Sequence, residues 1–192
     1  MRPASAVLLL SCALVCAACT NPPDKEMNQA RGAIEAARAA GADLYAPDEF
    51  KAAVAALKRS EDAVDQRDYR QALGYALDSR EQAQNAARTA ANQKAAVGSQ
   101  AERELHDLQT ALGRARNRLK AAEGPRARRR ALQDAGRTLD SVAAAVQKAR
   151  AAMDRQDYLA AREAMRGVDG QLQAAIGQID QSTGAPAARR RR

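Results

Sequence analysis

The sequence is poor in the bulky residues that fill most protein cores. It has no Trp, one Phe and one His among 192 residues, and it contains no long apolar run. A β-sandwich or an α/β enzyme needs more aromatic and β-branched side chains than this. A multi-span membrane protein needs several apolar stretches of about 20 residues. These absences argue against all three classes.

Alanine dominates the residues that are present. There are 49 Ala, whereas Val, Ile, Leu and Phe together number 28. Those four types make up about 15% of the chain, which carries a net charge of +8, and a highly charged chain below roughly 20% is expected to be disordered. However, Ala, Glu, Lys, Leu and Arg together make up about 55%, which is typical of long helices when helical periodicity is present. Periodicity therefore decides between disorder and helix.

The first nineteen residues predict an export signal. Arg2 is followed by uncharged residues from Ala4 to Ala18, a run shorter than the about 20 residues of a membrane-spanning helix. A positive start, a short apolar region and small residues at its end are typical of a signal peptide. Ala17-Ala18-Cys19 resembles the lipobox of bacterial lipoproteins, in which the Cys becomes the lipid-bearing first residue. We therefore predict a signal peptide over 1–18 and lipidation of Cys19.

Three alternatives remain at this end of the chain. The first is lipidation of Cys12, which follows Leu-Leu-Ser and forms a second lipobox-like site. The second is an ordinary signal peptide cleaved after Ala18, and the third is an uncleaved anchor. All three cysteines lie in this segment, so we expect no disulfide, thiolate nucleophile or Cys-based metal site in the rest of the chain. Thr20 stands where inner-membrane lipoproteins often have Asp. This favours the outer membrane, on its periplasmic side.

Beyond a spacer that contains Pro22-Pro23, apolar residues recur at steps of three and four, which predicts helices. Met27 to Leu44 marks the first helix, with a break at Gly41. Tyr45-Ala46-Pro47 predicts the start of a second, because Pro suits the first helical turn. Asp68 is a candidate N-cap for a third helix that ends at Gly98 and Ser99. The expected apolar faces are Phe50, Val54, Leu57 and Val64 in the second helix, and Tyr69, Leu73, Ala76 and Leu77 in the third.

The clearest apolar face lies further along the chain, and a repeat follows it. This face is expected to end at Gly124-Pro125. Asp65, Asp68, Tyr69 and Ala72 recur 89 residues later, which predicts two helical hairpins that turn at an Asp-x-x-Asp-Tyr corner. The Tyr ring is expected to pack between the helices. The apolar face comprises Leu105, Leu108, Leu112, Ala115 and Leu119. The first of two later stripes comprises Val142, Val146, Ala149 and Met153, and the second comprises Tyr158, Ala161, Met165, Val168, Leu172, Ile176 and Ile179. The repeated corner comprises Asp154, Asp157, Tyr158 and Ala161.

We therefore predict an all-α protein, an elongated helical bundle of coiled-coil-like hairpins with about five or six helices. A homo-oligomer could cover the face from Leu105 to Leu119, and packing within one chain would cover it equally well. The predicted divisions are the signal peptide over 1–18, the lipidated Cys and spacer over 19–24, a first hairpin unit over 25–98, a connecting helix over 99–123, a second hairpin unit over 126–181 and a flexible polybasic tail over 182–192.

The chain resembles two known families, the closer of them over roughly 24–96. The hairpin corners are weakly similar to tetratricopeptide-type repeats. More closely, the lipid-attachment Cys, the Ala-rich helix, Tyr45-Ala-Pro-Asp-Glu-Phe50 and the later Asp68-Tyr69 resemble an uncharacterised family of bacterial envelope lipoproteins. Some members of that family carry an OmpA-like peptidoglycan-binding domain downstream. The function of the family is unknown, so the resemblance implies location and architecture but no activity. The stretch after Ala96 lacks the strand and helix pattern of an OmpA-like domain, so we do not expect this chain to inherit peptidoglycan binding.

The sequence offers no arrangement typical of catalysis. His106 has Asp107 beside it, but adjacent helical residues point about 100° apart and do not pair. The glycines are dispersed, and no phosphate-binding loop is present. We therefore expect no enzyme, no cofactor and no metal site.

Arginine clusters are the one feature that suggests a contact surface. Arg can hold phosphates and carboxylates with two hydrogen bonds. We predict a lipid-anchored structural or protein-interaction module of the envelope, bound to the membrane through its N-terminal lipid. The alternative is a binder of anionic cell wall or lipopolysaccharide; nucleic-acid binding would require the export signal to be misread, and we expect no nucleic-acid partner. The candidate contact residues are Arg126, Arg128, Arg129, Arg130, Arg189, Arg190, Arg191 and Arg192.

Overall fold

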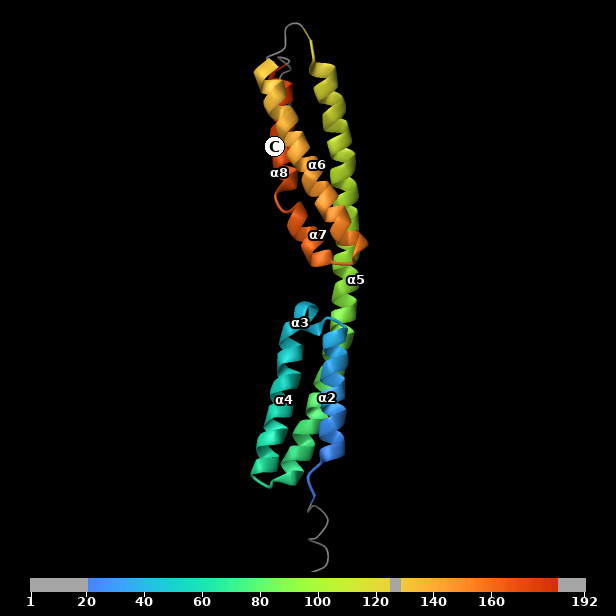
Figure 1. The fold of residues 1–192 in the computed structure, drawn as a ribbon, viewed down its shortest axis with the longest axis vertical. Coiled ribbons are helices and arrows are strands. Elements are labelled where there is room, and N and C mark those ends of the chain that lie inside the picture. The colour runs from blue at the N-terminus through green and yellow to red at the C-terminus, as the bar shows by residue number, and fades with distance from the viewer. Residues whose placement is uncertain (1–20, 125–128, 183–192) are drawn as a thin grey trace, which may run out of the picture. The chain divides into compact units, whose positions relative to one another are not determined.

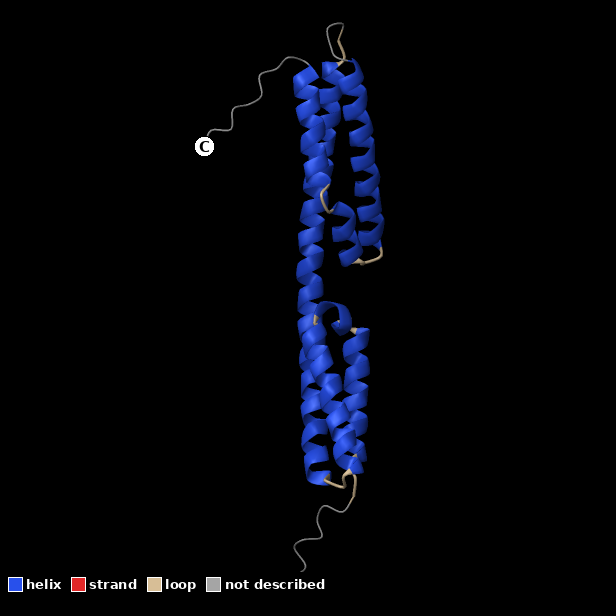
Figure 2. Ribbon diagram, turned by 90° about the vertical axis from the view of Figure 1, so that its left-hand side faces the viewer, coloured by secondary structure: helices blue, strands red, loops and turns tan. Residues whose placement is uncertain are grey.

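A computed structural model describes residues 21–124 and 129–182. Across these ranges it contains helices and connecting turns and no strand (Figure 2). Six helices have eight residues or more, and α3 is a single turn of four. The predicted all-α class and number of helices are therefore confirmed. The chain separates into two compact units, with the boundary between Lys94 and Ala95, here called unit 1 and unit 2.

Unit 1 is a three-helix bundle in which α2, α4 and the first part of α5 lie side by side (Figure 1). Gly41 adopts a left-handed conformation, with φ 81°, which only glycine adopts without steric cost, and it ends the first helical stretch. Pro47 begins α4, as predicted, with Asp48 and Glu49 in the positive first turn. The bounds are α2 Asp24–Ala39, α3 Ala42–Tyr45, α4 Pro47–Asp65 and α5 Tyr69–Ala122, of which unit 1 contains the part up to Lys94.

The core of unit 1 differs from the predicted one. Val54, Leu73 and Leu77 were expected inside, yet their exposed fractions are 41%, 37% and 40%, and Leu44 is 63% exposed. The buried positions of α4 and α5 are instead filled by small side chains, because the two helices pack closely through alanine and serine. Besides Phe50, they comprise Ala53, Ala56, Ser60, Ala63, Ala72, Ala76, Ser79, Ala83, Ala86 and Ala90.

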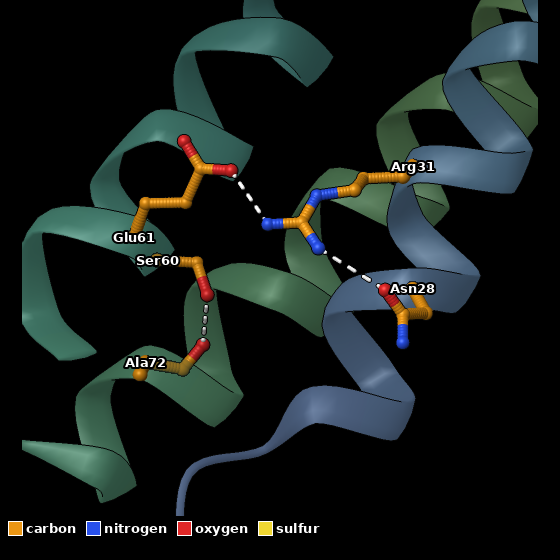
Figure 3. A network of polar contacts seen from close by, with 5 residues as sticks. All are labelled: Asn28, Arg31, Ser60, Glu61 and Ala72. Atoms are coloured by element: carbon orange, nitrogen blue, oxygen red, sulfur yellow. Dashed lines mark hydrogen bonds and ion pairs between the residues drawn. The ribbon is translucent and has the colours of Figure 1, made fainter.

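Two serines join α4 to α5 inside this core. The Ser60 hydroxyl donates to the Ala72 carbonyl at 2.8 Å (Figure 3), and the Ser79 hydroxyl donates to the Ala53 carbonyl, also at 2.8 Å. A side chain this short reaches the backbone of a neighbouring helix only where the two helices approach closely. The hydrogen bonds satisfy the buried hydroxyls, which would otherwise destabilise the unit.

Unit 2 is also a helical bundle, and its core follows the predicted stripes. The last part of α5 packs with α6, α7 and α8 (Figure 1). Leu108, Leu112 and Ala115 are buried, with Leu105 and Leu119 packed against them, so packing within one chain covers this face. The bounds of the remaining helices are α6 Arg129–Asp154, α7 Tyr158–Met165 and α8 Val168–Ser182.

α5 continues through the position where we expected it to stop. It includes Gly98 and Ser99 and ends at Ala122, so 99–123 is not a separate connecting helix. Gly98 is helical and leaves room for the Tyr158 ring, whose Cε2 lies 3.0 Å from the position that a Cβ would take. The contact places this ring against α5, which lies outside the hairpin of α6 and α7 where we expected the ring, and it explains a glycine in a helix interior.

The repeated corner has the same backbone geometry in both units. Arg67 and Gln156 are the two non-glycine residues with positive φ in the described ranges, at 61° and 58°. In each corner the residue after them donates its N–H to a carbonyl five residues earlier: Asp68 to Ala63 at 2.9 Å, and Asp157 to Ala152 at 3.0 Å. This pattern is the Schellman C-cap.

The same two aspartates also begin the next helix. The Asp68 carboxylate accepts from the Gln71 N–H, and the Asp157 carboxylate accepts from the Ala160 N–H, both at 3.0 Å. The N-cap predicted at Asp68 is therefore confirmed. Each corner ends one helix and starts another within four residues, and the shift of 89 residues relates the Schellman and N-cap hydrogen bonds of the two corners.

Candidate functional site

Most of the predicted contact residues lie outside the described ranges. This applies to Cys19, Arg126, Arg128 and 189–192, to the predicted signal peptide, and to the predicted tail except Ser182, which ends α8 instead. Arg129 and Arg130 are described: they are the first two residues of α6, and both are exposed. The predicted contact surface can therefore be followed only at the start of α6.

The two arginines stand at an unfavourable place for helix stability. A helix N-terminus carries a partial positive charge, so basic residues there destabilise it by about 0.3–1 kcal/mol each. α2 and α4 have acidic residues in their first turns, whereas α6 has none. Within 21–124 and 129–182, neither Arg129 nor Arg130 makes an ion pair. An external anion at this end would relieve the repulsion.

A groove of about 690 Å³ lies beside Arg129, between the end of α5 and the start of α6. Leu119 and Leu132 give it an apolar side, and Gly136 widens it because it has no side chain. Glu123 adds one negative charge. The full lining is Leu119, Glu123, Gly124, Arg129, Leu132, Gln133 and Gly136.

Two arginines that precede Leu119 on α5 are loosely paired. Arg116 lies 3.9 Å from Asp140, and Arg118 lies 3.5 Å from Asp180. Exposed pairs of this kind contribute about 0–1 kcal/mol. The guanidinium groups therefore remain free to exchange these carboxylates for another anion.

His106 is exposed on α5, and it lines a second groove, of about 440 Å³, in unit 2. Arg150 and Asp154 of α6 and Tyr158 of α7 face the same groove. Arg150 was not predicted from the sequence, because 44 residues separate it from His106. The 89-residue shift could have pointed to it, since that shift relates Arg150 to Glu61. Within the described residues, no three His, Asp, Glu or Cys side chains are grouped to hold a metal ion.

The helices themselves do not provide a membrane span. None of those in 21–124 and 129–182 combines the length and the apolarity that crossing a bilayer requires.

The comparison with known proteins identifies one domain. Residues 25–101 match the family model of a domain of unknown function, DUF4398. This range contains all of α2, α3 and α4 and the start of α5, and it extends seven residues past Lys94 into unit 2. No curated protein and no solved structure matches the chain.

Proposed function

We propose that this protein is a lipid-anchored, non-enzymatic structural or interaction module of the bacterial cell envelope, acylated on Cys19. The observation that carries the proposal is the N-terminal sequence: Arg2, an uncharged run, and Ala17-Ala18 directly before Cys19. α2 begins at Asp24, five residues after Cys19. Two acyl chains anchor a protein far more firmly than one, so a lipidated Cys19 would hold unit 1 close to the membrane.

The buried serines of the two units have a packing role. Catalytic side chains are typically desolvated and free to act on a substrate. Among the described residues, the Gln82 Oε1 is a buried side-chain atom without a hydrogen-bond partner, whereas the buried polar residues are Ser60, Ser79 and Ser182. Each donates its hydroxyl to a backbone carbonyl, so these groups serve packing.

Fatty-acid labelling tests the anchor. Labelled palmitate is expected to appear on the wild-type protein and on Cys12→Ser, but not on Cys19→Ser. Cys12→Ser is the matched control, because it removes the alternative lipobox. Label that persists in Cys19→Ser would overturn the assignment of Cys19, and an unlabelled wild-type protein in the cytosol would overturn the envelope location.

The outer membrane, on its periplasmic side, is the proposed location because Thr20 follows Cys19. Membrane fractionation of wild type and Thr20→Asp tests this. The wild type is expected with the outer membrane and Thr20→Asp with the inner membrane. An identical distribution of the two would contradict the proposal.

A second candidate function is binding of anionic envelope polymers, either cell wall or lipopolysaccharide. The observation that favours it is the pair Arg129 and Arg130, unpaired at the positive end of α6. Deletion of 189–192 is expected to weaken sedimentation with cell-wall material if this candidate is right. Sedimentation that is unaffected by the deletion and by changes at Arg129 and Arg130 would favour the first candidate alone.

A further inference from the structure

The two units differ at one pair of equivalent positions. In unit 1, the Arg31 Nη2 lies 2.9 Å from the Glu61 Oε1, and the Arg31 Nη1 donates to the Asn28 Oδ1 at 3.1 Å (Figure 3). This network connects α2 to α4 near the Asp65 corner. The paired Arg31 and Glu61 side chains therefore bridge the two helices at the surface of unit 1.

Equivalent residues in unit 2 follow from two registers. The corner relates α4 to α6 by 89 residues, which pairs Glu61 with Arg150. The buried stripe of α2 recurs in α5 after 78 residues, which pairs Arg31 with Gln109 and Asn28 with His106. The stripes are Met27, Ala30, Ile34 and Ala37 in α2, and Leu105, Leu108, Leu112 and Ala115 in α5, with Leu105 the one member that is only partly buried.

The ion pair of unit 1 is therefore absent from unit 2. Gln109 replaces the cation and Arg150 replaces the anion, and Arg150 makes no hydrogen bond or ion pair with the described residues. The 440 Å³ groove lies at these positions. A free guanidinium thus lines a groove where the other unit has a salt bridge.

The charges along the groove are separated. α5 and α6 run antiparallel, so Gln109 and Arg150 lie toward one end and Glu102 and Asp154 toward the other. Four residues of helix correspond to about 6 Å, which is the spacing along α6 between Arg150 and Asp154. Leu105, His106, Met153 and Tyr158 lie between or beside the two ends. One end therefore suits an anion and the other a cation.

We propose that this groove binds a small zwitterion, the size of a dipeptide, whose carboxylate and ammonium groups are about 6 Å apart. The carboxylate pairs with the Arg150 guanidinium, which can donate two parallel hydrogen bonds. The ammonium lies between the Glu102 and Asp154 carboxylates. The proposal is independent of the lipid anchor and of the arginines at the start of α6.

His106 makes the test specific, because it is the one histidine of the chain and its ring proton resonances therefore report on this groove alone. Purified full-length protein is titrated with glycylglycine at constant pH and followed by proton NMR. Glycylglycine is expected to shift the His106 resonances saturably, with a Kd on the order of 1 mM. N-acetylglycine and glycinamide, which each carry one of the two charges, are expected to bind at least tenfold more weakly. Equal or unsaturable shifts with all three compounds would overturn the proposal.

Variants connect the shift to the proposed contacts. Arg150→Gln is expected to weaken glycylglycine binding at least tenfold, whereas Arg155→Gln, an exposed change at the corner that does not line the groove, is expected to leave it unchanged. The double variant Gln109→Arg, Arg150→Glu introduces the pair found in unit 1 and is expected to abolish binding without loss of helical circular dichroism. Binding that survives in this folded double variant would overturn the proposal.

Discussion

The Tyr158 ring lies so close to Gly98 that a Cβ on Gly98 would come within 3.0 Å of the Tyr158 Cε2. Gly98 is buried in the interior of α5, and Tyr158 begins α7. Alanine has a higher helix propensity than glycine by about 1 kcal/mol. An alanine at position 98 would therefore raise the helix propensity of α5, but its Cβ would come too close to the Tyr158 ring.

We predict that Gly98→Ala destabilises the protein, because overpacking costs about 1–3 kcal/mol and exceeds the gain in propensity. The matched control is Gly113→Ala, in the same helix, where no atom lies within 4 Å of the added Cβ; it is expected to stabilise by up to about 1 kcal/mol. Thermal unfolding followed by circular dichroism measures both. Equal stabilisation by the two changes would show that the Tyr158 ring moves away at no cost.

The serines between α4 and α5 give a second prediction. Ser79→Ala is expected to lower the free energy of unfolding by about 0.5–1.5 kcal/mol, the net contribution of one hydrogen bond. Ser79→Val, which introduces the residue found at the equivalent Val168, is expected to cost more, because unit 1 packs small side chains closely here. Urea unfolding measures the series, with the exposed Ser99→Ala as control. A Ser79→Val protein as stable as wild type would contradict the close approach.

The two corners give a third prediction. Asp68→Ala and Asp157→Ala are each expected to destabilise by about 0.5–2 kcal/mol, because each removes an N-cap hydrogen bond. Arg67→Gly and Gln156→Gly are expected to be neutral or stabilising, because both positions have positive φ. Urea unfolding checks the four variants. Destabilisation by the glycine changes would show that the side chains of Arg67 and Gln156 matter more than their backbone conformation.

The sequence predicted unit 2 better than unit 1, and the reason is side-chain size. In unit 2 the core positions are occupied by large apolar residues such as Leu108, Leu112 and Leu172, so their spacing identifies the buried face. In unit 1 the core consists largely of alanine, which occurs on every face of these helices and carries little directional information. Because Leu73 and Leu77 are large and apolar, their face of α5 was predicted to be buried, but it is partly exposed.

The groove residues could not be predicted from periodicity alone. Gln109 and Arg150 line one groove because α5 and α6 pack antiparallel. An apolar repeat of three and four residues predicts which face of a helix is buried, but it does not predict which polar residues of two helices lie next to each other. The corner repeat did contain the necessary shift of 89 residues. That shift relates Arg150 to Glu61, but the sequence does not show that Glu61 forms an ion pair with Arg31 in unit 1.

The start of α6 gives the last prediction, one that separates binding from stability. Replacing Arg129 and Arg130 by Glu places two negative charges at the positive end of a helix, which is expected to stabilise α6 by about 0.3–1 kcal/mol per residue. If these arginines hold anionic polymer, the same change weakens sedimentation with cell-wall material, and the wild-type binding falls as salt rises. The exposed Arg137, which is paired with Asp134, gives the control Arg137→Glu. A double variant that is more stable yet binds less would show that the two arginines destabilise α6 and bind an anion. Unchanged binding would show that the two arginines have no binding role.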